Sequence, residues 1–224
     1  MTKLLFKMTA LVGFIFFSCN QADDKKQPQE TKQTTTNLQS EIDNYKKTIP
    51  ETNQDPQNSE WRNNVYRNKF YKFRVEFPKG WEYDNGTTKS TLARALNREY
   101  AAAISVTITH LPDEPKNPNN IIESMPLQNY TSQFNELLAL QNTKAENLNI
   151  EKGALNNFPA YVIDFTSKVS SGTQSYIYLS KQIQCYYDGK IYQVNLNLPK
   201  DLYDAQMERD FNRVVNSFNF EIAY

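Results

Sequence analysis

The side chains most often used in catalysis are scarce in this chain. It has one histidine, His110, and two cysteines, Cys19 and Cys185, in 224 residues. A Ser-His-Asp or Cys-His arrangement would have to use His110, which ends an alternating apolar segment and is most simply a partly buried strand-end residue. The sequence contains no HExxH, CxxC, GxGxxG or Walker pattern. We therefore predict no enzyme, no cofactor and no metal site, and keep a hydrolase with a site assembled across the fold as a third hypothesis.

Cys19 is the residue with the most specific predicted chemistry. Two lysines precede an apolar run over residues 8–17, and Ser18 stands directly before Cys19. This order is typical of a signal peptide, and the run is too short to span a bilayer of about 30 Å as a helix.

The residues around Cys19 also resemble a bacterial lipobox, with Phe16 where that motif prefers leucine. The resemblance implies cleavage after residue 18 and attachment of lipid, such as palmitate, to the thiol of Cys19. An ordinary secretory signal with an incidental cysteine and an uncleaved anchor are the alternatives.

Residues 19–58 are predicted to form a disordered tether. They are rich in Gln, Asn, Thr, Lys and Asp and hold too few large apolar residues to form a core. A flexible chain of this length has a root-mean-square span of roughly 35 Å. Asp23-Asp24 resembles the export signal of some Bacteroidetes surface lipoproteins, or is simply the solvated start of the tether.

The formal net charge of the whole chain is zero, which gives nucleic-acid binding no electrostatic support.

Asp188-Gly189 marks a β-hairpin within the predicted folded domain, residues 59–224. Asp-Gly between two alternating runs is a strong signal for a type I′ turn. This turn places Cys185 opposite Tyr192 on an apolar face, so we expect Cys185 to be buried. Lys181 opposite Leu196 is the one misfit and predicts a bulge or a sheet edge.

The other face of this hairpin is predicted to be a ligand-binding surface. It combines tyrosine rings with uncharged amide side chains, which suit neutral hydrogen-bonding ligands such as glycans, or a protein partner. A solvated sheet face, or one partly covered by a helix, is the simpler alternative. The candidate residues are Tyr176, Tyr178, Gln182, Gln184, Tyr186, Gln193 and Asn195.

The remaining periodicities predict an α+β fold, with an antiparallel sheet and two long helices packed on it. An amphipathic helix is expected after Pro126, with Tyr130, Phe134, Leu137 and Leu138 facing the core. A second helix is expected over residues 201–218, capped by Asp201, with Leu202 in its apolar stripe. The expected strands cover residues 71–77, 91–97, 101–111, 146–153 and 160–168, with short extended pieces after Trp81 and at Phe218 and Phe220.

Residues 73–81 (FRVEFPKGW) and the closing run 214–218 (VVNSF) resemble PsbP-like and DcrB-like domains. The resemblance covers residues 66–222 and implies an α/β/α sandwich around an antiparallel sheet. Members of this superfamily serve in photosystem assembly, in small-GTPase contact and as bacterial envelope lipoproteins, so the fold selects no single function. Metal-binding histidines of photosynthetic members have no counterparts in this sequence.

Two hypotheses for function follow. The first is a noncatalytic envelope lipoprotein, lipid-anchored to the membrane through Cys19, whose PsbP-like domain binds a protein partner or supports an envelope complex. It would belong to the outer membrane, on its surface or periplasmic face. The second is a surface lipoprotein that binds glycans or small ligands through the tyrosine and amide face described above.

Overall fold

The computed structural model describes residues 58–86, 88, 90–110, 120–140, 143–171 and 174–221. The predicted signal peptide and all but the last residue of the tether, with Cys19 and Asp23-Asp24, lie outside the described residues. Among the described residues, no helix is long and apolar enough to cross a membrane. The elements are β1 (Ser59–Arg62), β2 (Val65–Asn68), β3 (Phe73–Glu76), β4 (Glu82–Asp84), β5 (Thr91–Asn97), β6 (Ala102–His110), α2 (Ile121–Ser124), α3 (Leu127–Leu140), β7 (Ala145–Leu155), β8 (Phe158–Ser171), β9 (Gln174–Tyr187), β10 (Lys190–Pro199), the 3₁₀ turn η2 (Lys200–Leu202), α4 (Ala205–Ser217) and β11 (Asn219–Phe220).

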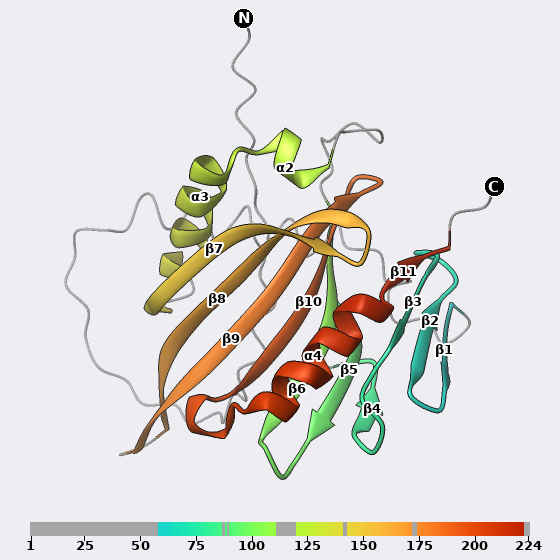
Figure 1. Cartoon of the computed structure of the whole chain (residues 1–224), viewed down its shortest axis with the longest axis horizontal. Helices are drawn as coiled ribbons and strands as arrows, with labels where there is room; N and C mark the ends of the chain where they lie inside the picture. The colour runs from blue at the N-terminus through green and yellow to red at the C-terminus, as the bar shows by residue number, and fades with distance from the viewer. Residues whose placement is uncertain are drawn as a thin grey trace, which may run out of the picture.

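A seven-stranded antiparallel sheet forms the centre of the molecule (Figure 1), in the order β4-β5-β6-β10-β9-β8-β7. Helix α4 packs on one face of this sheet and α2 and α3 pack on the other, so the apolar residues form two separate cores. The predicted α+β fold, with an antiparallel sheet between helices, is confirmed.

A second sheet of four strands, in the order β1-β2-β3-β11, lies beside the first (Figure 1) and was not predicted. The predicted strand over residues 71–77 is shortened because Lys72 has a left-handed backbone, with φ of 51°. The inward face of this sheet joins the α4 core, where Phe73 stacks on Phe218 with ring centroids 5.1 Å apart. The outward face is therefore free to carry polar residues.

The hairpin of β9 and β10 has the predicted register. Asp188 and Gly189 have φ of 48° and 73°, as a type I′ turn requires. Cys185 pairs with Tyr192 and is fully buried, which confirms its predicted place in the core.

The predicted bulge or sheet edge at Lys181 is wrong, because Lys181 pairs with Leu196 without a break and β9 lies inside the sheet. The ammonium of Lys181 instead leaves the core and reaches polar groups at the surface. Its Nζ lies 3.1 Å from the Tyr203 hydroxyl and 3.1 Å from Glu208 Oε2, so the long side chain can lie on an apolar face.

Helix α4 begins later than predicted. Asp204 is its N-cap, and its carboxylate accepts hydrogen bonds from the backbone N–H groups of Gln206 (2.8 Å) and Met207 (2.9 Å). The predicted cap, Asp201, lies in η2, and Leu202 is 36% exposed rather than part of the apolar stripe. Helix α3 has the predicted core stripe, with Tyr130, Phe134, Leu137 and Leu138 all buried.

Candidate functional site

The amide side chains of the late hairpin share one face of the sheet, as predicted, but this face is closed. Gln184 pairs with Gln193 and Gln182 with Asn195. All four side chains are buried, with exposures of 1% to 5%, and Tyr186 is 6% exposed. The prediction that these five residues form an outward-facing surface is therefore wrong, and the glycan hypothesis loses most of the surface on which it was based.

Helix α3 and the segment before it provide a physical reason. The Tyr130 ring stacks on Tyr161 of β8, with ring centroids 4.3 Å apart, and the Tyr161 hydroxyl donates to the backbone oxygen of Met125 at 2.6 Å. Phe134 packs edge-on against Phe165. The amphipathic stripe of α3 thus needs this face of the sheet for its own burial.

The buried amides satisfy one another in a connected network. Gln184 Nε2 donates to Gln193 Oε1 at 2.8 Å, and Gln193 Nε2 donates to Asn195 Oδ1. Asn195 Nδ2 contacts the hydroxyl oxygens of Ser105 and Thr107, each at 3.4 Å. Buried polar groups that are paired in this way stabilise and align the strands, so the network is part of the fold.

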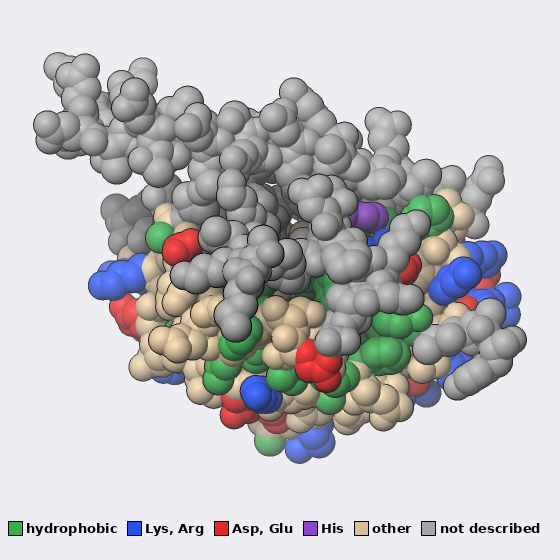
Figure 2. All heavy atoms as spheres, turned by 90° about the horizontal axis from the view of Figure 1, so that it is seen from above, with side chains coloured by type: hydrophobic (Ala, Val, Ile, Leu, Met, Phe, Trp, Pro, Cys, Tyr) green, Lys and Arg blue, Asp and Glu red, His purple; other side chains and the backbone are tan. Residues whose placement is uncertain are grey.

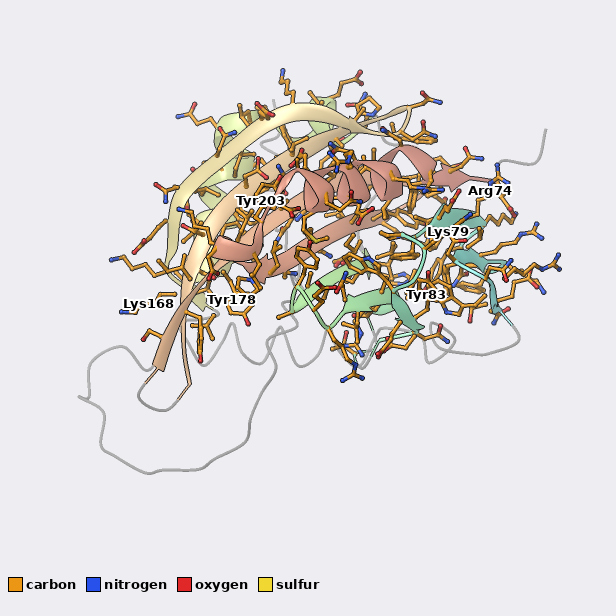
Figure 3. The ribbon with its side chains drawn as sticks, turned by 60° about the horizontal axis from the view of Figure 1, so that its bottom comes forward. Arg74, Lys79, Tyr83, Lys168, Tyr178 and Tyr203 are labelled. Carbon is orange, nitrogen blue, oxygen red and sulfur yellow. The ribbon has the colours of Figure 1, made fainter. Side chains whose placement is uncertain are left out.

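Tyr176 and Tyr178 have a different environment from the five buried residues. Tyr176 and its neighbour Ile177 are 45% and 50% exposed, and Tyr178 is partly exposed. Tyr176 and Ile177 belong to a two-stranded arm formed by Lys168–Ser171 of β8 and Gln174–Ile177 of β9, and Tyr178 lies at the base of this arm, where β9 still pairs with β10. Figure 3 shows this end of the hairpin, near the labels of Lys168 and Tyr178, extending beyond the body of the molecule.

The strand register explains why the arm projects. Strand β7 pairs with β8 no further than Ser167, and β10 pairs with β9 no further than Tyr178. Beyond these points β8 and β9 pair only with each other among the described strands, from Lys168 opposite Ile177 to Ser171 opposite Gln174. The β8 edge of the arm, from Lys168 to Ser171, is therefore an outer backbone edge that no described strand occupies.

The described titratable groups form no recognisable catalytic arrangement. His110 contacts the Tyr71 hydroxyl through Nε2 at 3.0 Å, and burial, followed by nearby Lys190, lowers the pKa of its imidazole. Burial raises the pKa of the Cys185 thiol well above its ordinary value, which keeps this thiol protonated and unreactive. No group of three or more His, Cys, Asp or Glu residues in the described part of the chain is placed to hold a metal ion.

Two adjoining surface hollows lie at the small sheet, one on its outward face and the other where that face meets the end of α4 and the turn between β7 and β8. One, of about 300 Å³, is lined by Glu60, Arg62, Val65, Arg67, Arg74 and Glu221. The other, of about 360 Å³, is lined by Val65, Arg74, Val75, Glu76, Asn156, Asn216, Ser217 and Asn219. The sequence analysis predicted the strand over residues 71–77, which contains Arg74, but missed these hollows, because strands β1 and β2 were not predicted.

No protein-family model and no curated protein matches the chain. Among solved structures, it is similar to cyanobacterial PsbP (CyanoP) from Synechocystis sp. PCC 6803, with 17% identity over 70% of this chain and 91% of that chain, and a TM-score of 0.48. It is also similar to the Ran-binding protein Mog1p of Saccharomyces cerevisiae, with 9% identity over 72% and 97% of the two chains and a TM-score of 0.47.

A third similar structure is LpqN of Mycobacterium tuberculosis, a protein involved in cell envelope biogenesis. It has 10% identity over 66% of this chain and 82% of that chain, and a TM-score of 0.41. At these identities the likeness concerns the arrangement of strands and helices alone. The function of the chain has to be argued from its own residues.

Proposed function

We propose that this chain is a noncatalytic, lipid-anchored envelope protein whose folded domain binds a protein partner. The observation that carries the proposal is the projecting arm of β8 and β9, with Tyr176 and Ile177 exposed near its base. The lipobox-like sequence that ends at Cys19 supports the anchor. The scarcity of reactive side chains, and a buried Cys185, support a binding role over a catalytic one.

The chemistry of the arm favours a protein as the partner. The outer edge of β8 in the arm, from Lys168 to Ser171, offers a row of backbone N–H and C=O groups, and a strand of another protein is the natural complement to such a row. Exposed Ile177 and the ring of Tyr176 supply the apolar contact that backbone pairing alone lacks. Lys168, which pairs with Ile177, adds a charge that disfavours indiscriminate pairing between arms.

The predicted tether fits this role. A flexible span of roughly 35 Å would let the domain search the space near the membrane while the lipid keeps it there. Tethering raises the effective concentration of the arm near a membrane-bound partner, so modest affinity is sufficient.

The proposal can be tested by photo-crosslinking in cells. A crosslinking amino acid is placed at Ile177 in the full chain, and at Lys152, an exposed residue of β7 outside the arm, as the matched control. We expect a discrete product with another protein from position 177 and none from position 152. The absence of a discrete product at 177, or the same products at both positions, would contradict partner binding by the arm.

The anchor is tested separately, by membrane fractionation of the wild type and Cys19→Ser. Loss of the Cys19→Ser chain from the membrane fraction supports lipidation, and unchanged membrane association refutes it. Protease treatment of intact cells then places the domain. Removal from intact cells indicates the outer surface, and resistance until the envelope is opened indicates the periplasm.

A further inference from the structure

The outward face of the small sheet gathers arginine side chains around the two hollows. Arg62, Arg67 and Arg74 line the first hollow, and Arg74 also lines the second. Figure 2 shows basic and acidic side chains crowded at the end of the molecule that carries the small sheet in Figure 1. Two carboxylates, those of Glu60 and Glu221, line the first hollow with the three arginines, which leaves an excess of positive charge there.

Two of these arginines stand directly opposite each other. Arg67 of β2 pairs with Arg74 of β3, and like charges in directly opposed positions destabilise a sheet. Arg67 is partly neutralised, because its Nε and Nη2 donate to Glu221 Oε2 at 2.9 and 2.7 Å. Arg74 makes no hydrogen bond or ion pair with the described side chains, so its guanidinium keeps its five donors for another group.

Glu60 does not saturate the remaining guanidinium groups. Its carboxylate oxygens lie 3.6 Å from Arg62, 3.9 Å from Arg67 and 3.7 Å from Lys69. A charge-assisted hydrogen bond between such groups is about 2.7–2.9 Å long, so these are loose contacts. An incoming oxyanion would therefore find donors on Arg62 and Arg74 without breaking a direct bond.

The second hollow adds uncharged donors next to Arg74. Asn216 and Asn219 line it, and Asn219 pairs with Arg74 across β3 and β11. Asn156 also lines it but already donates to the Phe218 backbone oxygen at 2.8 Å. The Glu76 carboxylate in the same lining accepts hydrogen bonds from Asn64 and Arg213, and the Arg213 guanidinium compensates its charge. Amide side chains next to an arginine fork can bond the backbone of an extended peptide while the fork binds its carboxylate. Neither hollow is lined by Tyr, Trp or Phe, so the described lining offers no flat ring on which a sugar could stack.

We propose that these hollows bind an acidic protein segment, with a side-chain carboxylate held by Arg74 and its neighbour Arg62. Figure 3 places Arg74 at the opposite end of the molecule from Lys168 of the arm and Tyr178 at its base. The proposed carboxylate site is therefore separate from the arm and goes beyond the proposed function. The two sites could engage different parts of one partner or two different proteins.

The test measures binding of an oligoglutamate peptide with blocked ends to the full chain in detergent micelles, at low salt. Arg74→Gln removes the guanidinium group that would bind the carboxylate. Arg209→Gln is the matched control, because Arg209 is an exposed arginine of α4 outside both hollows. Inorganic phosphate and polyphosphate are titrated in parallel. Thermal unfolding of each variant shows that the fold is retained.

We expect the peptide to bind the wild type and Arg209→Gln equally and to bind Arg74→Gln at least about tenfold more weakly, with affinity falling as salt is added. Three results would overturn the proposal: no peptide binding, equal loss in both variants, or binding of phosphate and polyphosphate alone. The last result would assign the hollow to phosphate groups instead of acidic protein segments. If Arg74→Gln unfolds, Arg74→Lys keeps the charge and removes the fork, and the same weakening is expected.

Discussion

The hydroxyl of Tyr130 donates a hydrogen bond of 2.6 Å to Oε1 of Gln184, and so joins helix α3 to the centre of the seven-stranded sheet. Both side chains are buried, and burial raises the pKa of the Tyr130 hydroxyl well above its ordinary value. The hydroxyl therefore remains a donor at neutral pH. Gln184 in turn donates to Gln193 at 2.8 Å and to Gln182 at 3.4 Å, so this bond connects α3 to the amide network.

Tyr130→Phe tests the importance of that bond. The substitution keeps the ring that stacks on Tyr161 and leaves the buried Gln184 Oε1 without its donor. We expect the free energy of unfolding to fall by about 1–3 kcal/mol in urea denaturation. Tyr178→Phe, at a partly exposed tyrosine, is the control and should change little. A Tyr130→Phe variant as stable as the wild type would show that the network does not depend on α3.

The N-cap of α4 can be tested with two aspartates that lie close in the sequence. Asp204→Ala removes the bonds to the Gln206 and Met207 N–H groups and should cost about 0.5–2 kcal/mol of unfolding free energy. Asp201→Ala, in the 3₁₀ turn, should cost much less, because Asp201 does not cap α4. The opposite ranking in thermal or urea unfolding would favour the cap predicted from the sequence.

The hairpin register was predictable because one local signal, Asp188-Gly189, fixes every later pair once the turn type is known. The core stripe of α3 was predictable from its period of about 3.6 residues. Neither signal says what covers a polar strand face. Gln182 and Gln184 look solvent-exposed in sequence, since amides are usually at the surface. Both are buried and bonded to one another, and Gln184 is also bonded to Tyr130 of α3.

The small sheet and its hollows were missed for a related reason. Strands β1 and β2 have four residues each, too few for alternation to stand out, and β11 has two. Arg67 and Arg74 are distant enough in sequence that only strand pairing brings them together. The candidate carboxylate site is thus a product of tertiary structure, which spacing along the chain does not reveal.

Cys185 should be inert to thiol reagents in the folded chain. The thiol is fully buried, so a reagent in solution cannot reach it. Burial also raises the pKa of the thiol, so the reactive thiolate form is scarce at neutral pH. In the Cys19→Ser chain, where Cys185 is the only remaining cysteine, maleimide labelling should be negligible under native conditions and complete in denaturant. Rapid native labelling would contradict the placement of Cys185 in the core.

The pH dependence of stability should include a contribution from His110. Burial, and then Lys190, lowers the pKa of the His110 imidazole in the folded chain below its ordinary value of about 6.5. The unfolded chain therefore binds this proton first as the pH falls. Below about pH 6.5 the folded state loses stability, until the pH passes the lowered pKa of the folded chain.

His110→Gln isolates this contribution, because a glutamine can still bond the Tyr71 hydroxyl but does not titrate. Carboxylates titrate in both proteins and cancel in the comparison. We expect the wild type to lose more unfolding free energy than His110→Gln between about pH 7.5 and pH 5 in urea denaturation. Parallel curves would mean that His110 has the same pKa in both states. A wild type that gains stability relative to the variant on acidification would mean that its imidazolium has an acidic partner in the folded chain, which contradicts the environment formed by Tyr71 and Lys190.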